Sequence, residues 1–341
     1  MACLLLACLA IAAQDPAGYW SFDEGSGSAA FDESGHNATG TLVGDVQWRQ
    51  GRLGQGLYFP GANGAYVDIP DGDWNRGAPL TFLCWVKNGF EEREHPPGVL
   101  LSHQERGESG LFGLTLNGGN YLGFAVWDAT HLERKQRKED PERSVGEAIQ
   151  DVDWVHLAFT IGEKELKYYK NGELRQTRAV DAFPASRGRL YVGSRGPAGD
   201  LPFKGWIDEL AVFDRVLPPA EIRSIYSAYR GGAPLLAKSA PDVVYVAAEK
   251  LFYSPGERGN AKVVVKNFSA QPREARLSVR VRTLLETDRE IHAETLKLEP
   301  RGRVARDVPL TFSGESHGAA LLASLDGGSP RESPPFAVSD N

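Results

Sequence analysis

A short aromatic segment carries the first side chains with a chemical use. Residues 121–127 read Tyr-Leu-Gly-Phe-Ala-Val-Trp, with large residues next to small ones. Successive side chains of a strand point to opposite faces, so Tyr121 and Trp127 share one face with only Gly and Ala between them. Such a flat aromatic surface suits the C–H groups of a sugar ring. We expect Tyr121 and Trp127 to contact a ligand, with Asp128 and His103 as polar companions; the alternative is that loops cover both rings.

Patterns for catalysis are missing from residues 17–230. This part has no Gly-x-Ser-x-Gly, no His-Glu-x-x-His and no phosphate-cradling glycine loop, and the one Gly-x-Ser-x-Gly of the chain, at 314–318, lies beyond it. Asp208 and Glu209 are adjacent in a predicted strand, and alternation places them on opposite faces. That geometry is wrong for a carboxylate pair that acts on one bond. His156 is expected to be a strand histidine with a hydrogen-bond partner, and the chain is not expected to be an enzyme.

Charge and hydropathy exclude two classes of protein. With 38 basic and 45 acidic residues the net charge is −7, which argues against nucleic-acid binding. No apolar run approaches the roughly 20 residues that a membrane-spanning helix needs.

The first residues predict an export signal. Residues 1–13 form an apolar run that ends on small residues, which predicts a signal peptide and a secreted, periplasmic or cell-surface protein. No Lys or Arg precedes the run, so the alternative is a misassigned start. A lipid anchor at Cys8 is a further alternative. Signal removal leaves Cys84 alone, which excludes an intrachain disulfide or a cysteine zinc site.

The elements that must position these residues are nearly all strands. Most segments alternate apolar and polar residues with period two, which indicates half-buried antiparallel strands. Asn171-Gly172 predicts a tight hairpin turn, because both residues tolerate a positive φ. A helix is expected after Pro218-Pro219, running to Tyr229. The highly charged residues 130–150 are expected to form a long solvated loop.

A series of different short motifs follows one after another over roughly residues 17–230. They are Tyr19–Gly27, Asp32–Gly35, Gly51–Phe59, Leu80–Val86, Trp154–Ala158, Tyr169–Gly172, Leu190–Gly193, Phe203–Leu210 and Phe213–Leu217. This set resembles the laminin-G-like (LamG-like) domain of bacterial exported proteins, in the concanavalin A-like lectin/glucanase superfamily. The resemblance implies two curved antiparallel sheets packed face to face, and binding of carbohydrate or protein.

The resemblance also implies a structural calcium ion between the first and last strands. Asp23 and Asp208 are the carboxylates placed to ligate it, with loop carbonyls completing the shell, since Ca²⁺ takes six to eight oxygens. The alternative is that both only cap turns or pair with arginine.

Trp85 and Trp154 are expected to be core aromatics. The glucanases of this superfamily carry a Glu-x-Asp-x-(x)-Glu motif, which residues 17–230 of this chain lack; the one such spacing in the sequence, at 286–290, lies outside the resemblance.

A second module follows the turn residues 230–234. Six or seven predicted strands in residues 240–338 resemble an immunoglobulin- or fibronectin-III-like accessory domain, which acts as a spacer. The predicted fold is therefore all-β: a concanavalin A-like two-sheet jelly roll followed by a smaller immunoglobulin-like β-sandwich.

The expected function is that of an exported, non-catalytic protein that binds a polysaccharide or glycan. Two alternatives stay open. The first is that the chain forms the front of a larger secreted glycoside hydrolase or sulfatase. The second is that it is a cell-surface module that binds protein.

Overall fold

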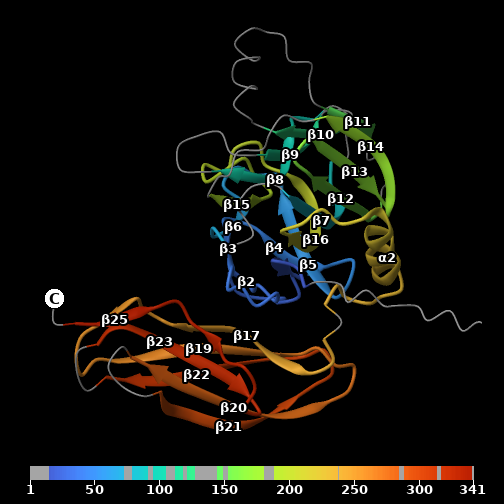
Figure 1. The fold of residues 1–341 in the computed structure, drawn as a ribbon. Coiled ribbons are helices and arrows are strands. Elements are labelled where there is room, and N and C mark those ends of the chain that lie inside the picture. The colour runs from blue at the N-terminus through green and yellow to red at the C-terminus, as the bar shows by residue number, and fades with distance from the viewer. Residues whose placement is uncertain are drawn as a thin grey trace, which may run out of the picture.

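The computed structural model describes residues 15–72, 79–90, 95–104, 112–117, 121–126, 144–148, 153–179, 188–236, 238–283, 288–312 and 316–339. The predicted all-β class is confirmed, since strands make up nearly all of the regular structure (Figure 1). Trp127 and Asp128, expected to contact a ligand, lie outside the described residues.

Two large antiparallel sheets form the first half of the protein. Sheet A has the order β14 (Glu173–Ala179), β13 (Glu165–Lys170), β12 (Val155–Ile161), β7 (Leu80–Asn88), β16 (Lys204–Phe213), β5 (Gln55–Pro60), β4 (Gln47–Gln50), with β1 (Gly18–Trp20) also paired to β16. Sheet B has the order β11 (Ser144–Ala148), β10 (Tyr121–Val126), β9 (Phe112–Asn117), β8 (Gly98–Gln104), β15 (Arg189–Val192), β6 (Tyr66–Ile69), β3 (Gly40–Val43), β2 (Ala29–Ala30). Strand β11 lies in the segment expected to be a loop, so the prediction for residues 130–150 was wrong at 144–148.

The core of this half lies between the two sheets and follows the alternation of each strand. Leu57 and Phe59 of β5 and Ile207 of β16 are buried in it, whereas the intervening Tyr58 and Trp206 are only partly buried. The inward residues exclude water and supply most of the stability. The outward residues therefore form a second surface on sheet A, called here its outer face.

Helix α2 (Pro219–Arg230) covers part of that outer face. The predicted helix is confirmed, and Pro219 occupies its first turn, where a missing N–H costs nothing. Ile222, Ile225 and Tyr229 pack in one apolar cluster with residues of sheet A such as Leu83. Among the described residues no helix is long and apolar enough to cross a bilayer.

The predicted hairpin between β13 and β14 is also confirmed. Lys170 pairs with Glu173, which leaves a two-residue loop. Asn171 and Gly172 have φ values of 52° and 79°, as a turn with two positive φ angles requires. The Asn171 side-chain oxygen accepts a hydrogen bond from the backbone N–H of His156 at 3.0 Å, which ties the turn to β12.

Two smaller sheets and a second apolar core form the other half. Sheet C has the order β17 (Pro241–Ala248), β19 (Arg258–Asn267), β22 (Arg303–Thr311). Sheet D has the order β18 (Phe252–Tyr253), β25 (Phe336–Val338), β23 (Ser316–Leu325), β20 (Arg273–Arg282), β21 (Arg289–Leu298), with β24 (Arg331–Glu332) paired to β23. Their facing side chains share one core.

The two halves meet where β2 approaches β17, as Figure 1 shows. Phe31 of the first half packs with Val244, Val264 and Phe268 of the second in a small buried apolar cluster. The Phe31 and Tyr245 rings lie 4.9 Å apart, centroid to centroid. Apolar contact therefore joins the halves directly, beyond the covalent link through residues 231–240.

Buried charges stand beside this apolar contact. The Glu33 carboxylate is fully buried; the Lys266 ammonium lies 2.8 Å and 2.9 Å from its two oxygens, and Arg303 also donates to it. Burial alone would raise the pKa of Glu33, but Lys266 and Arg303 outweigh it and hold the pKa below its usual value. A second Arg303 nitrogen lies 3.0 Å from Glu24, whose pKa burial raises to about 7.

Candidate functional site

A row of polar and aromatic side chains crosses the outer face of sheet A, beside the part that α2 covers. Strand register sets the row: Gln47 pairs with Tyr58, Tyr58 with Trp206, and Trp206 with Lys87. Trp154 continues it, because the next residue of its chain pairs with the residue that precedes Lys87. Paired residues of neighbouring strands lie side by side on one face.

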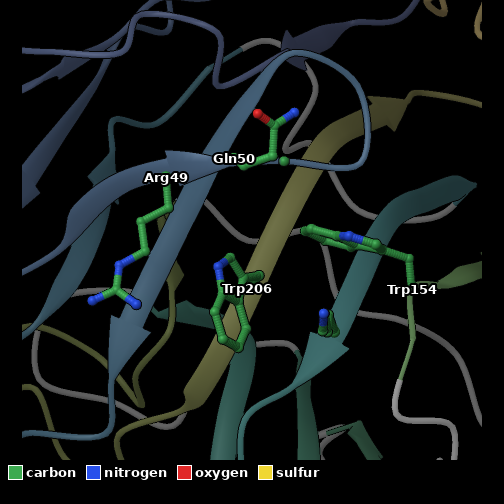
Figure 2. A pocket seen from close by; sticks show the side chains of 6 residues that line it. Arg49, Gln50, Trp154 and Trp206 are labelled. Atoms are coloured by element: carbon green, nitrogen blue, oxygen red, sulfur yellow. The ribbon is translucent and has the colours of Figure 1, made fainter.

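The row opens into a hollow of about 380 Å³, which we call the outer hollow. It is lined by Arg49, Gln50, Gly51, Lys87, Trp154 and Trp206. Figure 2 shows the Trp206 ring between the Arg49 side chain and the Trp154 ring, with Gln50 at one end. Two indoles, two cations and a side-chain amide thus border one space.

Aromatic and cationic groups contact one another in this row. The Tyr58 and Trp206 rings are 4.6 Å apart with an angle of 52° between their planes. The Arg49 guanidinium lies 3.9 Å from the Tyr58 ring centroid, and the Lys87 ammonium lies 5.4 Å from that of Trp206. These distances are in the cation–π range, so the rings orient the cations.

One hairpin turn forms the rim of the outer hollow, and two aspartate carboxylates hold it. Asp208 Oδ2 accepts hydrogen bonds from the backbone N–H groups of Arg52 and Leu53 at 2.8 and 3.0 Å. Asp23 Oδ1 accepts one from Gln55 N–H at 3.0 Å. A Cβ on Gly51 would come within 2.2 Å of the Gln55 carbonyl oxygen, so the close turn requires glycine.

A β-bulge in β16 places two neighbouring carboxylates on the α2 side of sheet A. The register with β7 shifts between Asp208 and Ala211, and Glu209 has a φ of 53°. Glu209 consequently accepts a hydrogen bond from the Tyr19 hydroxyl, in the cluster under α2. The expectation that Asp208 and Glu209 face opposite sides was wrong, because the bulge breaks the alternation.

Both bulge carboxylates are out of reach of solvent. Asp208 and Glu209 are 0% and 1% exposed. Burial, and then the neighbouring Glu209 charge, raises the pKa of Asp208; burial raises the pKa of Glu209 to about 8. As placed, neither group can touch a substrate. The Asp208 carboxylate holds the backbone of the turn, and the Glu209 carboxylate holds the Tyr19 hydroxyl.

Asp23 and Asp208, predicted to ligate calcium, do lie at the same turn, but their surroundings are a poor fit to the ion. Backbone N–H groups already donate to both carboxylates. The Lys266 ammonium lies 3.6 Å from Asp23 Oδ2 and brings positive charge to the same place. Within the described ranges no three His, Cys, Asp or Glu side chains form a metal-holding group. Calcium binding stays a prediction.

The predicted ligand residues are placed apart from the outer hollow. His103 is a fully buried residue of β8 in sheet B, and burial lowers its pKa to about 4. Tyr121 begins β10 of the same sheet, opposite Asn117. Sheet B therefore carries the part of the predicted site that lies within the described residues, and whether it contacts a ligand stays a prediction.

Sequence reasoning missed the outer hollow, although a signal for it was present. Trp206 and Lys87 each lie next to a buried residue of their strand, Ile207 and Val86, and strand alternation therefore predicts that both point outward. Trp154 was expected in the core; it packs at the edge of the cluster under α2, is only partly buried, and lines the outer hollow. Trp85 is buried as expected.

His156 differs from its prediction in one respect. It is a buried strand residue, but neither ring nitrogen has a hydrogen-bond partner within the described part of the protein. Its ring lies among aromatic rings instead, 5.3 Å from Trp85 and 5.8 Å from Tyr226 and Tyr229, centroid to centroid.

Several solved structures are similar to this chain at low identity. Domain 4 of AbnA, a GH43 extracellular arabinanase from Geobacillus stearothermophilus solved with arabinotriose, is 20% identical, with a TM-score of 0.46 over 62% of this chain and 97% of that one. Trypanosoma rangeli sialidase is 17% identical, with a TM-score of 0.48 over 64% of this chain and 33% of that one. The binding domain of botulinum neurotoxin DC, solved with rat synaptotagmin II, is 11% identical, with a TM-score of 0.49 over 92% and 72%.

No curated protein matches the sequence. A family model does match, over residues 61–223, and its description is the concanavalin A-like lectin/glucanases superfamily. The match includes Lys87, Trp154 and Trp206 of the outer hollow, while Arg49 and Gln50 come from the neighbouring β4 of the same sheet. Residues 61–223 thus belong to the concanavalin A-like lectin/glucanase superfamily, as the ordered motifs of the sequence predicted.

Proposed function

We propose that this protein is a non-catalytic carbohydrate-binding protein and that the outer hollow is its binding site. One observation carries the proposal: Trp206 and Trp154 border a space of about 380 Å³ on the part of sheet A that α2 leaves uncovered. Sites for small ligands usually measure about 300–1,000 Å³ and combine apolar walls with a few polar groups. The superfamily assignment of residues 61–223 supports the same class of ligand.

The lining suits a sugar because a sugar has two kinds of surface. Its C–H faces pack on indole rings, which Trp206 and Trp154 supply, and its hydroxyl groups accept and donate hydrogen bonds. Arg49 and Lys87 are donors, and the Gln50 amide both donates and accepts. Apolar stacking gives affinity here, and the polar groups give orientation.

The non-catalytic part of the proposal rests on access. Among the described residues, the adjacent carboxylates Asp208 and Glu209 are buried and serve the turn and the cluster under α2. Glycoside hydrolysis requires two carboxyl groups that flank the scissile bond. Export through residues 1–13 is a further part of the proposal and rests on the sequence alone. A calcium ion at Asp23 and Asp208 is not part of it, because backbone N–H groups and Lys266 already occupy those carboxylates, and the chelator arm below tests the ion.

The test is binding of the full chain to a broad polysaccharide and oligosaccharide array. We expect at least one glycan to bind, and Trp206→Ala to weaken its affinity at least about tenfold, or 1.4 kcal/mol. Trp154→Ala, from another strand, should also weaken binding and covers the case in which Trp206→Ala fails to fold. Phe252→Ala removes an aromatic ring that is 74% exposed in the other half, and should leave affinity unchanged.

Each assay is run with calcium and again with a chelator. Binding lost in chelator would support a calcium-dependent site, and binding that survives would leave the ion a structural role at most. A folded protein that binds no glycan in either buffer would contradict the proposal and favour a protein partner. Unchanged affinity in both tryptophan variants would move the site elsewhere, with Tyr121 of sheet B the next residue to substitute.

A further inference from the structure

The two cations of the outer hollow set its charge. The Arg49 guanidinium donates one hydrogen bond to the Gln47 side-chain oxygen, at 2.7 Å. Its side chain is exposed, so its other N–H groups can donate to a ligand. The Lys87 ammonium stands over the edge of the same space, 5.4 Å from the Trp206 centroid. Arg52, on the rim turn, does not line the hollow; its guanidinium lies 4.8 Å from the Trp85 ring centroid.

These cations lack the partners that balance others in the chain. Arg189 pairs with Asp68 at 2.6 Å and Arg215 with Glu221 at 2.6 Å. Within the described part of the chain neither Arg49 nor Lys87 has a carboxylate partner, and no carboxylate lines the outer hollow. The whole chain carries a net charge of −7, so this positive site stands on an acidic protein.

Cations beside aromatic rings select for a ligand with both an apolar face and a negative charge. A guanidinium presents planar N–H groups that match the oxygens of a carboxylate or a sulfate ester, and an ammonium adds a point charge. The rings would hold the sugar face while Arg49 and Lys87 hold the charged substituent. A neutral sugar would leave both cations without a counter-charge.

We infer that the outer hollow takes an anionic saccharide unit, one that carries a carboxylate or a sulfate ester. This inference rests on the proposed function, since it names the class of glycan bound at the same site. Arg49 and Lys87 are then the residues that discriminate against neutral sugars, and Trp206 and Trp154 are those that bind the ring.

The experiment measures affinity for matched glycan pairs that differ in charge alone. The probes are polygalacturonate with its methyl ester, for the carboxylate, and sulfated polysaccharides with their desulfated forms, for the sulfate. We expect the charged member of at least one pair to bind at least about tenfold more tightly. The pair whose members differ in affinity shows whether the site recognises a carboxylate or a sulfate ester.

Substitution assigns the discrimination to the outer hollow. Arg49→Gln and Lys87→Gln should each weaken binding of the charged probe about tenfold and weaken binding of its neutral form clearly less, so that the charged-to-neutral affinity ratio falls. Lys262→Gln and Arg223→Gln remove equal charge at exposed positions of β19 and α2, and should leave both affinities unchanged. Thermal unfolding confirms that each variant is folded.

The outcomes separate this inference from the proposed function. Neutral and charged probes bound equally, with binding lost in Trp206→Ala, would overturn the anionic preference and keep the carbohydrate site. A charge preference that persists in Arg49→Gln and Lys87→Gln would also overturn the inference, because other cations would then cause it. Absence of binding to every probe and array glycan would overturn both.

Discussion

His156 shows at the scale of a single residue how burial alone sets a pH dependence. Its ring is enclosed by Trp85, Tyr226 and Tyr229, and burial lowers its pKa to about 3. In the unfolded chain the imidazole becomes protonated near pH 6.5, whereas in the folded chain it becomes protonated only near pH 3. Stability from this group is therefore present above pH 6.5 and is lost as the pH falls toward 3, by about 1.4 kcal/mol per pH unit.

The corresponding prediction compares the wild type with His156→Phe in urea unfolding at pH 7 and pH 5. The wild type should lose about 2 kcal/mol more than the variant between the two pH values. Buried acids such as Glu24 and Glu209 titrate in both proteins, so their effects cancel in the difference. His36→Gln, at an exposed position, controls for the loss of an imidazole. Equal losses in wild type and His156→Phe would show that the ring is protonated in the folded state.

Helix α2 is the element that divides the outer face of sheet A into a covered part and a free part. Ile222 is fully buried against the sheet, so Ile222→Ala leaves a cavity and should destabilise the protein by about 2–5 kcal/mol. Ser224→Ala, on the exposed side of the helix, should change stability by less than about 0.5 kcal/mol. Chemical unfolding measures both. A small effect of Ile222→Ala would mean that α2 is not firmly seated on the sheet.

Elements whose cause is local could be predicted from the sequence. The Asn171-Gly172 turn and the start of α2 at Pro219 depend on the backbone preferences of a few residues, and both were predicted. The bulge at Glu209 could not be, because a charged residue with positive φ is held there by distant groups such as the Tyr19 hydroxyl.

The candidate site was missed for a related reason. Alternation shows that Trp206 and Lys87 point outward, but it does not show which outward residues α2 covers. Trp85 and Trp154 illustrate the limit: both were expected in the core, and only the first is fully enclosed by α2 and the sheet. Coverage of a sheet face depends on where a helix distant in sequence docks, which no short motif encodes.

At the scale of the whole molecule, the buried ion cluster joins the two halves. Glu33→Gln would remove the carboxylate 2.8 Å from the Lys266 ammonium, on a side chain that is only 7% exposed, and would leave it the more distant Asp23 at 3.6 Å. Loss of one member of a buried pair costs about 3–5 kcal/mol, so we expect a drop of that size in the free energy of unfolding. Small-angle scattering should also show a larger radius of gyration, because the contact between the halves weakens.

A surface pair supplies the control for this prediction. Lys250 and Glu257 form an ion pair within the second half, and the Lys250 side chain is 55% exposed. Lys250→Gln should leave both the unfolding transition and the scattering curve unchanged, since exposed pairs are well screened. A Glu33→Gln protein that matches the wild type in both measurements would show that the apolar contact around Phe31 suffices to hold the halves together.

The alternation of β5, β7 and β16 has a consequence for how this protein can change over generations. Leu57, Val86 and Ile207 hold the fold, while their chain neighbours Tyr58, Lys87 and Trp206 face outward. Selection can therefore vary the outward set with little penalty to folding, and new ligand preferences can evolve on an unchanged scaffold. A combinatorial library restricted to the outward positions should yield a high proportion of soluble, folded variants, whereas the same library at the inward positions should yield few.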